Sequence, residues 1–289
     1  MTSPETRTLS VAGATLTYDV RPGSGGEAPL FLVGSPMSAA GFVTLASHFA
    51  DRTVLTYDPR GVDRSPRTDG AAESSPEEHA EDLARVIEAV GAESLDVFAS
   101  SGGAVNALAL VARRPALVRT LVAHEPPIAA ALPDREAALR VFADMRETYL
   151  RDGLGAGMAK FIAAATHQGE FPQDWADGPA PDPAAFGLPT EDDGSRDDAL
   201  LGQNLRHCTG YEPDFAALRA ASTRLVIAAG RESEQEMTAR AAVGVAERLG
   251  LAPTWFPSHH GGFLGGEFGQ EGQPAEFAKT LRAVLDGKG

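Results

Sequence analysis

The chain is poor in several features, and each shortage excludes a class of protein. A single cysteine, Cys208, allows no internal disulfide and no four-cysteine metal site. No apolar run is long enough to span a membrane, and the first ten residues are polar, without the apolar core of a signal peptide. Basic residues are outnumbered 25 to 40 by acidic ones, and the net charge of −15 argues against nucleic acid or an anionic membrane as partner. We therefore expect a well-hydrated cytoplasmic protein.

Apolar residues, in contrast, are abundant enough for one large core. The chain has 289 residues, of which 43% are hydrophobic, so it can bury a sizeable single domain. We find no internal repeat and no coiled-coil heptads. The expected partner is a small-molecule substrate, and the composition leaves a homodimer open.

Strands and helices are expected to alternate over most of the chain. Residues 6–10 and 14–20 alternate apolar and polar side chains around Ala12 and Gly13, which predicts an antiparallel hairpin. Further strands are expected at residues 29–33, 53–57, 94–99, 119–125, 224–230 and 253–256, separated by helical segments at 42–50, 76–90, 104–112, 234–249 and 274–285. This order predicts a mainly parallel sheet with helices on both faces.

The alternation stops at Pro126 and Pro127 and resumes near residue 222. Between these points lie helical patterns (134–151, 155–165 and 197–207), a loop rich in Pro, Gly and Asp (171–195), and no convincing strand. An insertion at the carboxyl edge of a parallel sheet is where a lid over a site belongs. We therefore expect a core of residues 1–126 and 222–289 and a helical cap of residues 127–221.

Ser101 stands where one of these strands turns directly into a helix. Such a turn needs small residues two positions before and after it, and Ala99 and Gly103 meet that need. Ser100 is the weaker candidate, because Phe98 two positions before it is too bulky for the crossing. The pattern predicts a nucleophile elbow with Ser101 as the nucleophile and the Gly102 N–H directed at a developing oxyanion.

From about residue 6 to residue 286 the chain resembles the α/β-hydrolase superfamily. The resemblance rests on the Ser101 elbow, on residues 57–61 after the fourth strand and on residues 256–262 after the last strand. It implies an eight-stranded, mostly parallel sheet with a helical cap after the sixth strand, a catalytic triad and no cofactor. No metal is expected at the pair His259 and His260, because no further ligand at a suitable spacing joins them.

The same resemblance implies the residues that would activate Ser101. The histidine base of the family usually follows Pro-x-x on the last loop, which selects His260 and leaves His259 as a neighbour lining the pocket. The family's usual aspartate position after the seventh strand holds Ser233 here. Glu125 at the end of the sixth strand is then the preferred acid, as in certain haloalkane dehalogenases. Glu232 is the alternative, and Glu234 also flanks the position.

The oxyanion loop also departs from the family's pattern. Residues 34–37 take the place of the usual His-Gly stretch, and Pro36 has no N–H. The resemblance then assigns Met37 as the first oxyanion donor and Gly102 as the second. Residues expected to contact the substrate are Ser35, Pro36, Ser100, His259, Phe142, Tyr149 and Trp175.

These residues predict a serine esterase acting through an acyl-enzyme on Ser101. The substrate would be a small or medium carboxylic ester, a lactone or a related carbonyl compound. A haloperoxidase-like (perhydrolase) or carbon–carbon hydrolase activity would use the same triad and stays open. A non-catalytic ligand-binding protein on a degenerate hydrolase scaffold is the third hypothesis.

Overall fold

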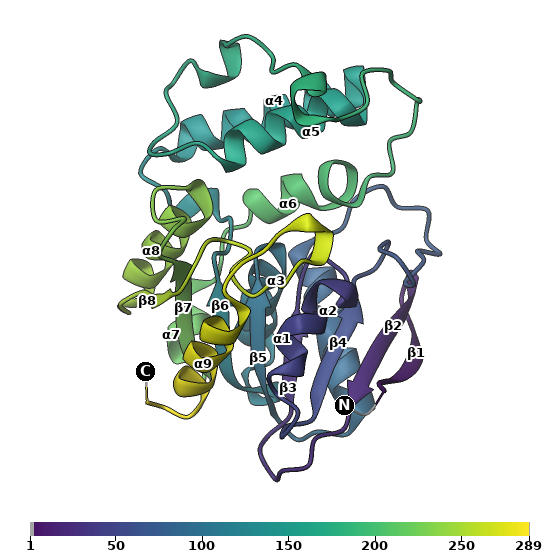
Figure 1. The fold of residues 1–289 in the computed structure, drawn as a ribbon, viewed down its shortest axis with the longest axis vertical. Helices are drawn as coiled ribbons and strands as arrows, with labels where there is room; N and C mark the ends of the chain where they lie inside the picture. Colours follow the sequence, from purple (N-terminus) through teal and green to yellow (C-terminus); the bar gives the residue numbers. More distant parts are fainter. Residues whose placement is uncertain (1–2, 289) are drawn as a thin grey trace.

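The computed structural model describes residues 3–288 and contains one eight-stranded sheet (Figure 1). Its strand order is β1-β2-β4-β3-β5-β6-β7-β8. The strands are β1 (Glu5–Val11), β2 (Ala14–Arg21), β3 (Leu30–Val33), β4 (Val54–Asp58), β5 (Leu95–Ser100), β6 (Val118–His124), β7 (Arg224–Gly230) and β8 (Thr254–Phe256). Strand β1 pairs antiparallel with β2, β2 pairs antiparallel with β4, and all other pairs are parallel. The predicted fold class is confirmed.

Helices cover both faces of this sheet. One face packs α2 (Pro76–Val90), α3 (Gly102–Arg113), α7 (Phe215–Ala220) and α8 (Met237–Leu249), and the other packs α1 (Val43–Ser47) and α9 (Pro274–Leu285). Strand β3 is buried on both faces, which explains its continuous apolar sequence; β5 is equally buried but includes Asp96, which pairs with Arg52 and Arg119. Helix α2 begins at a capping box formed by Ser75 and Glu78 and ends at Gly91 in the left-handed conformation.

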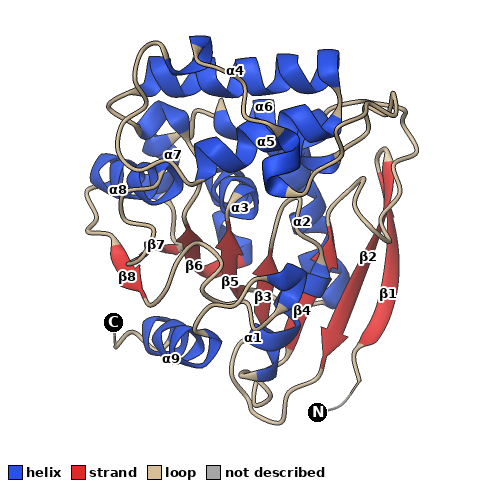
Figure 2. Ribbon diagram, turned by 45° about the horizontal axis from the view of Figure 1, so that its top comes forward, coloured by secondary structure: helices blue, strands red, loops and turns tan. Residues whose placement is uncertain are grey.

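The segment between β6 and β7 (residues 125–223), here called the cap segment, contains helices and, within the described residues, no strand. It holds α4 (Arg135–Asp152), α5 (Leu154–Ala165) and α6 (Leu205–Thr209), which share a third apolar cluster built around Met145 and Tyr149. Figure 2 shows these helices stacked beyond the carboxyl ends of the parallel strands. The helix expected at 197–207 is instead a π-helical turn (Ala199–Asn204) followed by α6. The boundaries 127–221 for a separate cap stay a prediction.

Residues 171–195, which were expected to form a loop, contain two short 3-10 turns (Trp175–Asp177 and Pro183–Phe186). No helix among residues 3–288 is both long and apolar enough to cross a membrane.

Candidate active site

Ser101 occupies a strained turn between β5 and α3. Its φ of 56° and ψ of −128° lie outside the regions that L-residues prefer, at a cost of about 1–3 kcal/mol. The turn is held by a 2.9 Å hydrogen bond from the Ser101 N–H to the His124 carbonyl. A Cβ atom on Gly103 would lie 2.5 Å from the Val33 carbonyl oxygen, so only glycine fits where α3 passes the end of β3.

His260 lies on the loop after β8 and is hydrogen-bonded to Glu125. The His260 Nδ1 atom is 2.5 Å from Glu125 Oε2, although 135 residues separate the two in sequence. Glu125 directly follows β6, has a φ of 48° and is fully buried. This bond fixes the tautomer of the neutral imidazole and leaves Nε2 free to accept a proton.

Three further donors stabilise the Glu125 carboxylate. Oε1 accepts from the Gly230 N–H at 2.7 Å and from the Ser233 hydroxyl, and Oε2 accepts from the Thr238 hydroxyl at 2.7 Å. Burial alone would raise the pKa of Glu125, but the hydrogen bond and charge of His260 outweigh burial and hold that pKa well below its usual range. Glu125 is therefore an anion beside His260.

The second candidate acid, Glu232, does not contact His260. Its carboxylate accepts from Gln273 Nε2 at 3.0 Å and from the Ser258 hydroxyl at 3.4 Å, and the residue is exposed. Ser233, which stands at the family's usual acid position, donates its hydroxyl to Glu125. The geometry thus favours Glu125 over Glu232 as the partner of His260.

The pKa of His260 is raised by its carboxylate neighbours. Burial alone would lower this pKa, but the hydrogen bond and negative charge of Glu125, with a smaller contribution from Glu236, outweigh burial. The imidazole is 37% exposed and lines the same cavity as Ser101. The His260 imidazole and Ser101 thus line one space.

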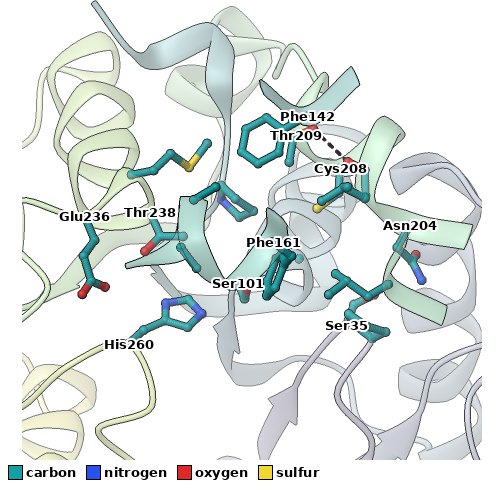
Figure 3. A pocket seen from close by; sticks show the side chains of 18 residues that line it. Ser35, Ser101, Phe142, Phe161, Asn204, Cys208, Thr209, Glu236, Thr238 and His260 are labelled. Atoms are coloured by element: carbon teal, nitrogen blue, oxygen red, sulfur yellow. Dashed lines mark hydrogen bonds between the residues drawn. The ribbon is translucent and has the colours of Figure 1, made fainter. Parts of the chain in front are cut away.

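That cavity has a volume of about 140 Å³ and lies between the sheet and the cap segment (Figure 3). Its walls are largely apolar. They are formed by Ser35, Pro36, Ser101, Gly102, Pro127, Phe142, Phe161, Ala164, Ala165, Leu200, Asn204, Leu205, Cys208, Thr209, Glu236, Met237, Thr238 and His260. An apolar pocket with a few convergent polar groups is typical of a small-molecule site.

The oxyanion loop differs from the expectation for Met37. Met37 is not among the residues that line the cavity, and its side chain packs against the second core cluster beside Gly41. Ser35 and Pro36, joined by a cis peptide bond, lie there instead. Within residues 3–288 neither the Ser35 N–H nor the Met37 N–H makes a hydrogen bond to another residue, so it is the cavity lining that separates the two. The Gly102 N–H opens α3, where helices leave such groups without an intrahelical partner.

Of the residues expected to contact the substrate, Ser35, Pro36 and Phe142 line the cavity and four others do not. His259 is hydrogen-bonded to the Glu271 carbonyl, and Tyr149 accepts from the Asp198 N–H at 3.0 Å inside the cap segment. Trp175 packs against His167 and Phe171. Tyr149 and Trp175 thus belong to the packing of the cap segment. The sequence could not show this, because an amphipathic pattern does not distinguish a core face from a pocket wall.

Ser100 also lies outside the cavity, since its hydroxyl is buried 3.2 Å from His124 Nδ1. The rings of His124 and His260 lie 6.0 Å apart between centroids. Burial lowers the pKa of His124 to about 4, so this ring is neutral and adds no positive charge beside His260.

Sequence reasoning missed Asn204, Cys208, Glu236 and Thr238. Two of them lie in α6 or its π-helical turn and two near the start of α8, and no motif marks them. Cys208 is the one thiol among the residues that line the cavity, and burial raises its pKa to about 12. It is therefore a neutral, unreactive wall residue.

The sequence and the fold of the chain are similar to those of known hydrolases. A family model described as alpha/beta hydrolase fold matches residues 30–179, just over half of the chain. An uncharacterised hydrolase of Bacillus subtilis, YraK, is 37% identical over 122 residues, which cover 41% of this chain and 44% of that protein. The match thus spans less than half of the relative's length.

Solved structures of esterases share the fold over nearly the whole chain. The carboxylesterase CesB of Bacillus subtilis superposes with a TM-score of 0.66 at 16% identity, covering 99% of this chain and 93% of the other. A thermophilic esterase of Thermogutta terrifontis superposes with a TM-score of 0.68 at 15% identity, covering 99% of both chains. At these identities the likeness concerns the fold.

Proposed function

The chain belongs to the alpha/beta hydrolase fold family, and on this basis we propose that it is a serine hydrolase that cleaves a small or medium carboxylic ester, lactone or related carbonyl compound. One observation carries the proposal: His260 is bound to the buried Glu125 anion on one side and shares a cavity with Ser101. The esterases among the structural relatives support the same class of reaction.

The proposed reaction uses only side chains and backbone groups of this chain. His260 Nε2 takes the proton of the Ser101 hydroxyl as its oxygen attacks the substrate carbonyl, and Glu125 stabilises the imidazolium. The oxyanion accepts from the Gly102 N–H and from the Ser35 N–H, which we propose in place of Met37. His260 then gives its proton to the leaving alkoxide, and water activated by the same histidine releases the acid from Ser101.

Labelling with a fluorophosphonate, followed by mass-spectrometric mapping, tests the proposal. Such a reagent phosphonylates a serine only where a base and an oxyanion hole activate it. We expect one label, on Ser101. Absence of labelling in the folded protein, or a label elsewhere, would contradict the proposal and favour a ligand-binding role.

A perhydrolase or a carbon–carbon hydrolase would also be labelled, and comparing peracid formation and diketone cleavage with ester turnover separates these activities.

The pH dependence of the reaction follows from the raised pKa of His260. Only the neutral imidazole can act as base, so activity is lost as the pH falls through this pKa. Because the pKa is raised, we expect the acid limb of kcat/KM to have its midpoint above 6.5. A profile recorded on a neutral ester from about pH 5 to 9 measures the limb. A midpoint below 6.5, or no acid limb, would contradict the pairing of His260 with Glu125.

A further inference from the structure

Glu236 places a second carboxylate on the wall of the cavity. It precedes α8 at the N-cap position, but its side chain accepts no capping hydrogen bond from that helix. Its one side-chain hydrogen bond within residues 3–288 comes from Gln168 Nε2 at 3.4 Å, beyond the usual range for such bonds. Unlike Glu125, Glu236 is thus a carboxylate that the surrounding structure leaves poorly satisfied.

The rest of the cavity offers this carboxylate no fixed cation. Among the described residues that line the cavity there is no lysine and no arginine, and His260, the lining group that can become positively charged, is already paired with Glu125. Burial and the charge of Glu125 raise the pKa of Glu236. Glu236 is half-buried at the N-terminus of α8, and an opposite charge beside such a carboxylate would form a favourable ion pair with it.

We propose that Glu236 is a specificity residue that binds a positively charged ammonium group of the substrate. The proposal rests on the serine hydrolase reaction proposed above and names the substrate class for that site. A cation in the cavity would supply the opposite charge that no lining lysine or arginine gives Glu236. The net charge of −15 adds a long-range attraction for cations and repels anionic substrates.

The position of Glu236 assigns the charge to the alcohol part of the substrate. Figure 3 shows Glu236, Thr238 and His260 on one side of Ser101, with Ser35 and Asn204 on the opposite side. The leaving alkoxide departs toward His260, because this residue gives it a proton. The ammonium group therefore belongs to an amino alcohol or a quaternary alkanolamine, and the acyl group occupies the other side.

A pair of substrates that differ only in charge tests the inference. Acetylcholine and 3,3-dimethylbutyl acetate share the same shape, with a quaternary nitrogen in the first and a carbon in the second. We expect kcat/KM to favour acetylcholine by about fivefold, in line with a partly screened ion pair. The assay is run at about pH 8, above the usual carboxyl pKa, and at about 0.15 M salt, where the Debye length is about 8 Å.

Two variants separate direct contact of the ammonium group with Glu236 from the long-range attraction of the acidic protein for cations. Glu236→Gln is expected to lower kcat/KM for acetylcholine more than for the neutral ester, and so to abolish the preference. Glu234→Gln removes the same charge from an exposed residue of the same loop that does not line the cavity, and is expected to keep the preference. If Glu236→Gln slowed both esters alike, or if Glu234→Gln removed the preference equally, the inference would be wrong.

A binding measurement keeps this test independent of turnover. Choline and 3,3-dimethylbutan-1-ol are titrated into the Ser101→Ala variant, with and without Glu236→Gln. Preferential binding of choline that depends on Glu236 supports the cation site even if the wild-type protein cleaves no ester, which would refute the proposed function alone. Equal binding of the two alcohols, together with ester cleavage by the wild type, would refute the cation site alone.

Discussion

Replacing Ser101 by alanine is expected to lower kcat for an activated aryl ester by about 10⁴-fold or more. The variant keeps His260, Glu125 and the two proposed oxyanion donors, but it has no nucleophile to form the acyl-enzyme. The fold should survive, because the Ser101 hydroxyl makes no hydrogen bond to another residue among residues 3–288, and the turn is held through its backbone. Turnover of a p-nitrophenyl ester, with thermal unfolding as the check on folding, measures the effect.

Ser100→Ala is the matched control for this prediction. Ser100 is the adjacent serine, it is buried, and its hydroxyl faces His124 rather than the cavity. We expect this variant to retain most of its activity. A loss in Ser100→Ala as large as that in Ser101→Ala would show that the loss follows from damage to the turn. Full activity in Ser101→Ala would contradict the proposed acyl-enzyme on Ser101.

Replacing Glu125 by glutamine is expected to lower kcat by about 10³- to 10⁴-fold. The buried Glu125 carboxylate accepts four hydrogen bonds, and both of its oxygens act as acceptors. The donors are His260, Gly230, Ser233 and Thr238. A glutamine side chain presents an NH₂ group to some of these donors. It therefore loses the charge that stabilises the imidazolium and also favours the wrong tautomer of His260.

Glu232→Gln provides the comparison for the acid. Glu232 lies close to Ser233 in sequence, but its carboxylate is exposed and contacts Gln273 and Ser258. We expect its kcat to remain near that of the wild type, and the rate of fluorophosphonate labelling to fall only in Glu125→Gln. The reverse result would mean that the last loop rearranges during turnover and brings Glu232 to His260.

In Glu125→Gln the acid limb of residual activity should also move to lower pH, because the charge that raises the pKa of His260 is gone.

The sequence by itself determined the features that depend on local spacing. The hairpin around Gly13, the apolar strands, the helix 274–285 and the strand–turn–helix at Ser101 all follow from residues close together in the chain, where side-chain size and backbone freedom restrict the structure directly. Ala99 and Gly103 mark the elbow by their small size, and at Gly103 a Cβ atom would meet the backbone at the end of β3. These features were sufficient to predict the fold class.

Only the tertiary structure decided between residues that are chemically alike and distant in sequence. Glu125 and Glu232 carry the same group, and the loop after β8 brings His260 to one and not to the other. Tyr149 and Phe142 lie on one helix, yet only Phe142 reaches the cavity. Glu236 belongs to no motif, because the cavity wall to which it contributes is assembled from the sheet edge and the cap segment. Long-range packing sets such contacts, and local sequence patterns carry no information on which distant side chains will meet.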